Sequence, residues 1–150
     1  MSVDRSYVAS NHTEQVRMQD LVRRLTDADL ARPMPAGWTV AAVLGHLALW
    51  DQRILVLLQE CAQEGSALPP AVRDADVHWI NDATKPFLLA LTPRAAADLA
   101  VAVAEAVDRA AAAVSEDFLA RNTAAGTPLN LARAVHRREH LDEIEHALRA

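Results

Sequence analysis

Thr39 to Gln63 reads TVAAVLGHLALWDQRILVLLQECAQ, a stretch long and apolar enough to form the central helix of a small protein. Thr39 suits the N-cap position of a helix, and Gly65 and Pro69-Pro70 follow the stretch as breaking residues. Apolar side chains recur at the spacing of one buried helical face: Val43, Leu47, Trp50, Ile54 and Leu57. The pattern predicts a helix from Thr39 to about Gln63 that is buried along one side.

The same periodicity predicts three further long helices, separated by breaks that contain proline, glycine or serine. Their expected ranges are Thr13 to Leu25, Thr92-Pro93 to the break at Ala124-Ala125-Gly126, and Thr127-Pro128 to the C-terminus. The side chains expected to face the core are Val16, Leu21, Val22 and Leu25 in the first of these and Leu99, Val103, Val107 and Val114 in the second.

The region after the central helix has no single period. We expect an irregular stretch from about Ser66 to Asp76 and then a short helical piece from about Val77 to Leu91, interrupted at Lys85-Pro86. Valine and isoleucine never form the alternating runs of strands, whereas alanine and leucine abound. The sequence therefore predicts an all-α fold, a four-helix bundle that spans residues 1–150 as one domain.

The composition limits the kinds of partner that the protein is expected to bind and the cell compartment in which we expect it. The formal net charge is −5, with acidic and basic residues interleaved, which argues against nucleic acid as the main partner. No uncharged apolar run approaches the roughly eighteen residues of a membrane span, so we expect a soluble protein. Met1 to Asn11 lacks the pattern of a secretion signal, and the single cysteine, Cys61, is interpreted as a structural thiol. These features favour the cytoplasm.

The three histidines that most resemble a site are His46, His136 and His140. His136 and His140 lie about 40° apart on one side of the last predicted helix, and Glu143 lies about 20° to the other side of His136. His46 shares the apolar face of the central helix with Val43 and Trp50. His12, His78 and His146 lie outside this geometry, at positions expected to be exposed or turned away.

Two interpretations of these histidines stay open on spacing alone. Each could be a core histidine satisfied by a hydrogen bond. Alternatively, the three converge on a divalent cation, because unprotonated imidazoles brought together need an acceptor for their lone pairs. Three neutral nitrogen ligands suit zinc or nickel and leave a coordination position open for water or substrate.

Two segments of the chain resemble the DinB-like superfamily, which includes the mycothiol-dependent maleylpyruvate isomerases. Gly37 to Asp51 resembles its first signature, with a tryptophan, a threonine and then a His-Leu pair, and His136 to Ile144 resembles the second. Asp76 to Asn81 resembles the middle segment of the family. The resemblance implies an up-down-down-up bundle, a metal held by His46, His136 and His140, and chemistry that involves a small thiol or hydrolysis.

Two functions are compatible with this sequence. In the first, the protein is a metal-dependent transferase or hydrolase that acts on a small molecule, with a low-molecular-weight thiol as a possible cofactor. Glu143 is then the candidate base, or it orients a ligand; a surface pairing with Arg137 or Arg138 is its alternative. In the second, the metal only staples two helices, and the alanine-rich faces form a homodimer.

Two arginine sites are interpreted as structural. Arg133, Arg137 and Arg138 sit among acidic residues and are expected to form a solvated helix face with local ion pairs. Arg53 is expected to extend out of the bundle, although it lies on a face where it could meet an anionic substrate.

Overall fold

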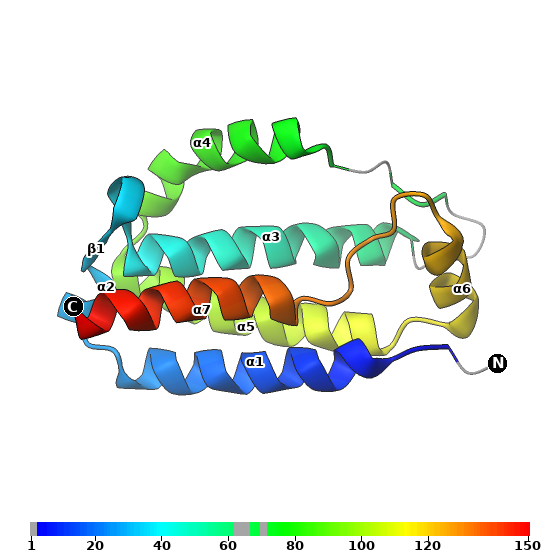
Figure 1. Ribbon diagram of the computed structural model, residues 1–150, viewed down its shortest axis with the longest axis horizontal. Helices are drawn as coiled ribbons and strands as arrows, with labels where there is room; N and C mark the ends of the chain where they lie inside the picture. Colours follow the sequence, from blue (N-terminus) through cyan, green and yellow to red (C-terminus); the bar gives the residue numbers. More distant parts are fainter. Residues whose placement is uncertain (1–2, 62–66, 70–71) are drawn as a thin grey trace.

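Four long helices form a bundle in the computed structural model, which describes residues 3–61, 67–69 and 72–150 (Figure 1). They are α1 (Ser6–Arg24), α3 (Val40–Cys61), α5 (Pro93–Ala112) and α7 (Ala134–Arg149). In Figure 1, α1 and α7 run in one direction and α3 and α5 in the other. Both α1 and α3 pack against α5 and α7. The all-α prediction is confirmed.

Shorter elements connect the long helices at the two ends of the bundle. At one end, α2 (Asp27–Leu30) leads into a small antiparallel hairpin of β1 (Pro33–Met34) and β2 (Trp38–Thr39) around the 3-10 turn η1 (Pro35–Gly37). The turn places Ala36 and Gly37 at positive φ values of 59° and 75°. Glycine adopts such values without steric cost, which explains the glycine at position 37. The sequence analysis did not predict this hairpin, which sets Trp38 directly before α3.

Two further helices complete the chain: α4 (Asp74–Ala90) and α6 (Glu116–Ala124). In Figure 1, α4 lies along the outer side of α3, and it contacts that helix. Gly45 permits this contact, because a Cβ there would lie 3.2 Å from Leu88 Cδ2. The packing of Leu88 also holds the last turn of α4 in place, which explains why the helix continues through Pro86 rather than breaking at Lys85-Pro86 as predicted.

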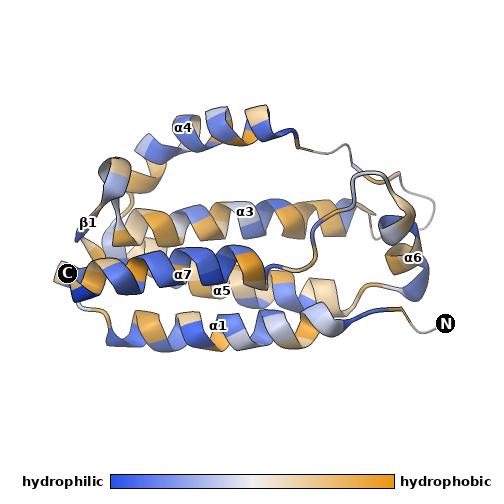
Figure 2. Cartoon of the chain, viewed as in Figure 1, coloured by the Kyte–Doolittle hydropathy of each residue, from blue (hydrophilic) through white to orange (hydrophobic). Residues whose placement is uncertain are grey.

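The central helix is the best predicted element. Thr39 Oγ1 accepts a hydrogen bond from the Ala42 backbone N–H at 3.1 Å, which confirms its capping role. The predicted end at Gln63 lies outside the described residues. By length and composition α3 could cross a membrane, but 67% of its apolar window is buried inside the protein, which is typical of the core helix of a soluble bundle. Figure 2 shows its apolar character beside the more hydrophilic α7.

The core stripe of α5 differs from the prediction. Leu99 is 46% exposed and Val114 lies beyond the helix and is only half-buried. The buried face instead runs through smaller residues: Ala96, Ala97, Ala100, Val103, Ala104, Val107 and Ala111. Alanine lets the backbones of α3 and α5 approach closely, so the stripe that packs best is not the one with the largest side chains. In α1, similarly, Val16 is exposed and Met18 is buried.

Helix boundaries differ where side chains from distant segments bind the backbone. The third long helix ends at Ala112, and Ser115 caps a separate α6 through a hydrogen bond from the Phe118 backbone N–H. The first helix, α1, begins at Ser6 and not at Thr13 as predicted. Tyr7 Oη donates a hydrogen bond to the Ala111 carbonyl at 2.7 Å, which holds this first turn against the end of α5. The irregular stretch predicted up to Asp76 is also shorter, because α4 begins at Asp74; residues 66, 70 and 71 are not described.

The last helix starts at Ala134, not after Thr127-Pro128 as predicted. Asn122 accepts from the Leu129 backbone N–H at 2.8 Å and donates to the Leu129 carbonyl at 2.9 Å. Asn11 accepts from the Ala134 backbone N–H at 2.9 Å. These bonds satisfy the backbone of the segment before α7 without helical bonds, so the segment stays outside a helix.

Candidate metal centre

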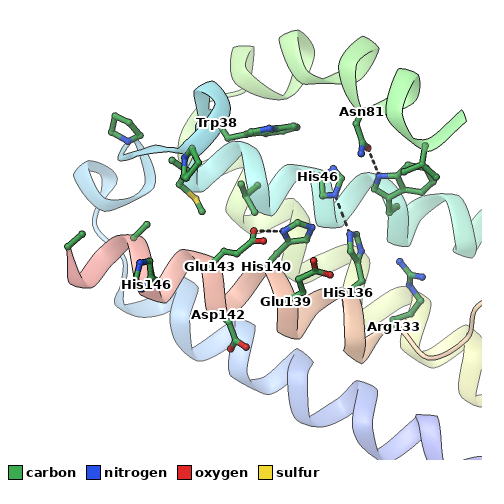
Figure 3. Close-up of a pocket in the computed structure, with 18 of the residues that line it drawn as sticks. Trp38, His46, Asn81, Arg133, His136, Glu139, His140, Asp142, Glu143 and His146 are labelled. Atoms are coloured by element: carbon green, nitrogen blue, oxygen red, sulfur yellow. Dashed lines mark hydrogen bonds and ion pairs between the residues drawn. The ribbon is translucent and has the colours of Figure 1, made fainter. Parts of the chain in front are cut away.

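The three predicted histidines converge where α3 meets α7. His46 lies in the first half of α3, and His136 and His140 lie in the first two turns of α7. Their candidate ligand atoms all lie within 4.8 Å of one another, and His46 Nε2 is 3.2 Å from His136 Nε2 (Figure 3). The geometry that the sequence predicted, with the i, i+4 pair facing the central helix, is present.

Burial keeps His46 and His136 uncharged. It lowers the pKa of His46 to about 4, with a smaller contribution from repulsion by His140. It also lowers the pKa of His136 to about 3, and repulsion by His140 and His46 adds to the effect. At neutral pH these two imidazoles are therefore unprotonated and have lone pairs available.

The donor set fits a divalent metal. Nitrogen ligands about 2.0–2.1 Å from a tetrahedral zinc lie about 3.3 Å from each other, close to the 3.2 Å that separates the two Nε2 atoms. His46 Nδ1 is buried and has no hydrogen-bond partner among the described residues. Two neutral imidazoles whose Nε2 atoms face each other can share at most one hydrogen bond, whereas a cation at the cluster would accept the lone pair of each nitrogen.

Glu143 contacts the cluster from one side. Its Oε2 lies 2.8 Å from His140 Nδ1, and Figure 3 shows the carboxylate pointing toward that ring. By accepting a hydrogen bond from Nδ1–H, the carboxylate orients the ring and leaves Nε2 free as a ligand atom. The alternative pairing of Glu143 with Arg137 or Arg138 is wrong: Arg138 binds Glu14, and Arg137 binds Asp51 and Asp108.

The cluster lies on the wall of a cavity of about 1160 Å³. Trp38 and Trp50 pack edge-on against His46, with ring centroids 5.7 and 6.4 Å away. Trp50 Nε1 donates to Asn81 Oδ1 at 3.0 Å and so links α4 to the cavity wall. This gives the asparagine of the middle segment a structural role. The histidines are therefore reached from a space with aromatic walls that is large enough for a small organic molecule.

A buried network of charges lies directly beside the histidines, and the sequence analysis missed it. Arg137 is 0% exposed, and its guanidinium binds Asp51 on α3 and Asp108 on α5. Arg133, 5% exposed, donates from Nε to Asp51 Oδ1 at 2.7 Å. The predicted solvated face of Arg133, Arg137 and Arg138 is therefore wrong for its first two members. The available signal was Asp51 itself, an acidic residue inside an otherwise apolar helix that needs a buried partner.

Burial raises the pKa of Asp108, and the hydrogen bonds and charge of Arg137 act in the opposite direction. Arg137 also donates to the Asn11 carbonyl at 3.2 Å, and Gln15 donates to Asp108 Oδ2 at 3.2 Å. The network thus joins all four long helices. It holds the first turn of α7, and with it His136, at a fixed position against α3.

The remaining candidates lie outside the cluster. His146 is exposed and lines the cavity, and His12 and His78 are exposed as expected. Cys61 is buried at the other end of α3, where burial raises the pKa of its thiol. Arg53 is half-buried, with its guanidinium 6.0 Å from the centroid of the Trp50 ring, so it does not extend freely into solvent as predicted.

Comparison with known proteins adds one finding. A sequence profile described as the DinB superfamily matches residues 11–140, a range that contains all three histidines of the cluster. No curated protein and no solved structure matches the chain.

Proposed function

This chain belongs to the DinB superfamily, and we propose that it is a metal-dependent transferase or hydrolase that acts on a small molecule. The observation that carries the proposal is the convergence of three histidines, two of them held neutral by burial, on the wall of an open cavity. A purely structural site closes its coordination sphere with protein ligands, whereas a site with three protein ligands beside a cavity has room for a reactant.

His46, His136 and His140 would hold the metal, and their neutral nitrogens suit zinc or nickel. When bound, such an ion lowers the pKa of a coordinated water or thiol and polarises an electrophile. We favour a low-molecular-weight thiol as the co-reactant, in line with the chemistry of the family. The cytoplasmic location that we also propose would keep such thiols reduced.

Protein side chains define the environment of the reaction. Glu143 holds His140 by its Nδ1 and, being half-exposed at the cavity, is also placed to accept a proton from a bound reactant. Trp38 and Trp50 cover His46 and limit water on that side.

The alternative function is a metal that only staples α3 to α7. The cavity favours catalysis over this alternative, because a structural site needs no opening for reactants. A homodimer through the alanine-rich faces also has less support than expected, since the alanines of α5 that form its stripe are buried within the bundle: Ala96, Ala97, Ala100, Ala104 and Ala111. A dimer through other surfaces stays a prediction.

The test begins with elemental analysis of the purified protein, for which we expect about one zinc or nickel per chain. The protein is then loaded with cobalt, and its visible spectrum is recorded as cysteine or another small thiol is added. Sulfur entering the coordination sphere should add a charge-transfer band. Thiol-transfer and ester-hydrolysis screens follow on the metal-loaded protein. A spectrum that no added thiol alters, together with the absence of turnover, would favour a metal that only joins α3 to α7.

A further inference from the structure

Arg133 has an unusual position between two cavities. It precedes α7 as its N-cap residue, and it lines both the histidine cavity and a second cavity of about 200 Å³. Within the described part of the chain, the one hydrogen bond of its side chain runs from Nε to Asp51. Its two Nη nitrogens have no protein partner there, and they are not among the fully enclosed atoms. A residue that is only 5% exposed thus keeps its terminal donors at the cavities.

At the second cavity, the charges around Arg133 leave a surplus of positive charge, whereas the histidine cavity has Glu139, Asp142 and Glu143 on its wall. Asp51 and Asp108 together balance Arg137 and Arg133. Arg53 lines the second cavity with Arg133 and has no ion pair with any described residue. Burial lowers the pKa of Arg53, and repulsion by Arg133 adds to this effect. Two guanidiniums therefore line the second cavity, and of the two only Arg133 has a carboxylate partner, Asp51, so the charge of Arg53 is not balanced there.

We propose that Arg133, assisted by Arg53, binds a carboxylate of the substrate next to the histidine cluster. This rests on the proposed function, and it narrows the substrate class to small molecules that carry a carboxylate. A free pair of Nη donors matches the two oxygens of a carboxylate. The surplus of one charge favours a monoanion over a phosphate dianion.

The position of Arg133 relative to His136 sets the length of such a substrate. The two residues are three positions apart, which places their side chains next to each other along α7. Figure 3 shows both side chains on the side of α7 that faces the cavity. A carboxylate bound at Arg133 therefore leaves a carbon only a few bonds away within reach of the histidine cluster. Asp51 fixes Arg133 for this role, so we assign Asp51 as a positioning residue.

The test uses propionate as the probe and propionamide, its uncharged analogue, as the control ligand. Binding to the purified metal-loaded protein is followed by calorimetry and by the Nε–H NMR signals of arginine. We expect propionate, and not propionamide, to bind and to shift the Arg133 signal, with the Arg138 signal unchanged. Arg133→Gln should weaken propionate binding about tenfold, as expected for the loss of a charged hydrogen-bonded pair. Arg138→Gln, on the same helix but paired with Glu14, is the matched control and should bind normally.

Equal binding of propionate and propionamide, or unchanged propionate binding by Arg133→Gln, would overturn the inference. If Arg133→Gln does not fold, two other measurements test the inference. An Arg133 signal of the natural protein that propionate does not shift would contradict the inference, and so would full propionate binding by Arg53→Gln. Failure of the proposed function would appear separately, as protein without metal or as metal-loaded protein without turnover, because propionate binding requires no turnover.

Discussion

His46 Nε2 and His136 Nε2 lie 3.2 Å apart although 90 residues separate them in the sequence. Each belongs to a helix that other interactions hold in place: α3 by its apolar core face, and α7 by the buried bonds of Arg137. The imidazoles are therefore brought together by the folding of the whole bundle and not by a local loop. Such a site is organised before any ligand arrives, which favours tight metal binding.

The first prediction concerns the ligands. The double variant His136→Ala, His140→Ala should lose the metal, because a single remaining imidazole cannot hold it. Metal content per chain, measured by elemental analysis after gel filtration, is the readout. His146→Ala is the matched control, since His146 lies on the same helix and lines the cavity without joining the cluster, and it should keep the metal. Full metal content in the double variant would show that other residues hold the ion.

The second prediction concerns pH. In the metal-free protein, the folded-state pKa values of His46 and His136, about 4 and about 3, lie below the ordinary value of 6.5. Between these values the unfolded chain binds more protons than the folded chain, so the free energy of unfolding should fall as pH is lowered from about 6.5 toward 4. For His46 alone, this loss is on the order of 3 kcal/mol.

Urea denaturation of the chelator-treated protein from pH 7.5 to 4.5 measures this loss. His136→Gln, which has no titrating group at the position, should show a shallower decline over the same range. Equal slopes for the two proteins would mean that folding does not lower the pKa of His136, contrary to the burial that the structure shows. In metal-loaded protein, bound ion should be released as pH falls, because protons compete for the same nitrogens.

The sequence was informative about the histidines and not about the charges beside them. His136 and His140 could be paired from helical spacing, and His46 from its place on an apolar face, since both arguments need only local periodicity. Arg137 could not be placed in this way, because its burial depends on Asp108 from α5 and Asn11 from α1. Such long-range partners leave no period in the sequence.

The start of α7 was mispredicted for the same physical reason. Pro128 is a good helix-initiating residue, but Asn122 and Asn11 bind the backbone on either side of it, and the segment is not helical. In α5 the core face was assigned from the larger aliphatic side chains, whereas Ala96, Ala100 and Ala104 form much of the packed face.

The third prediction concerns the buried network. Arg137→Gln should lower the free energy of unfolding by about 3–5 kcal/mol, because it leaves Asp51 and Asp108 buried without their main cation. Arg138→Gln, one position along the helix and half-exposed, should cost no more than about 1 kcal/mol. Equilibrium urea unfolding at pH 7 measures both values. A small effect of Arg137→Gln would show that water or another side chain takes over the pairing.

The last prediction separates the two roles of Glu143. As a half-exposed residue bonded to His140 Nδ1, it can orient the ring, act as a proton acceptor at the cavity, or do both. Glu143→Gln keeps the size and a hydrogen-bond acceptor at this position but removes the charge. If the carboxylate accepts a proton during turnover, kcat should fall about 10²–10⁴-fold while metal content stays at one ion per chain. If it only orients His140, Glu143→Gln should retain most of the activity, and Glu143→Ala should weaken metal affinity about 10–100-fold. Loss of metal in Glu143→Gln itself would instead make Glu143 a fourth ligand, and the site would then be closed by protein groups, as a structural staple requires.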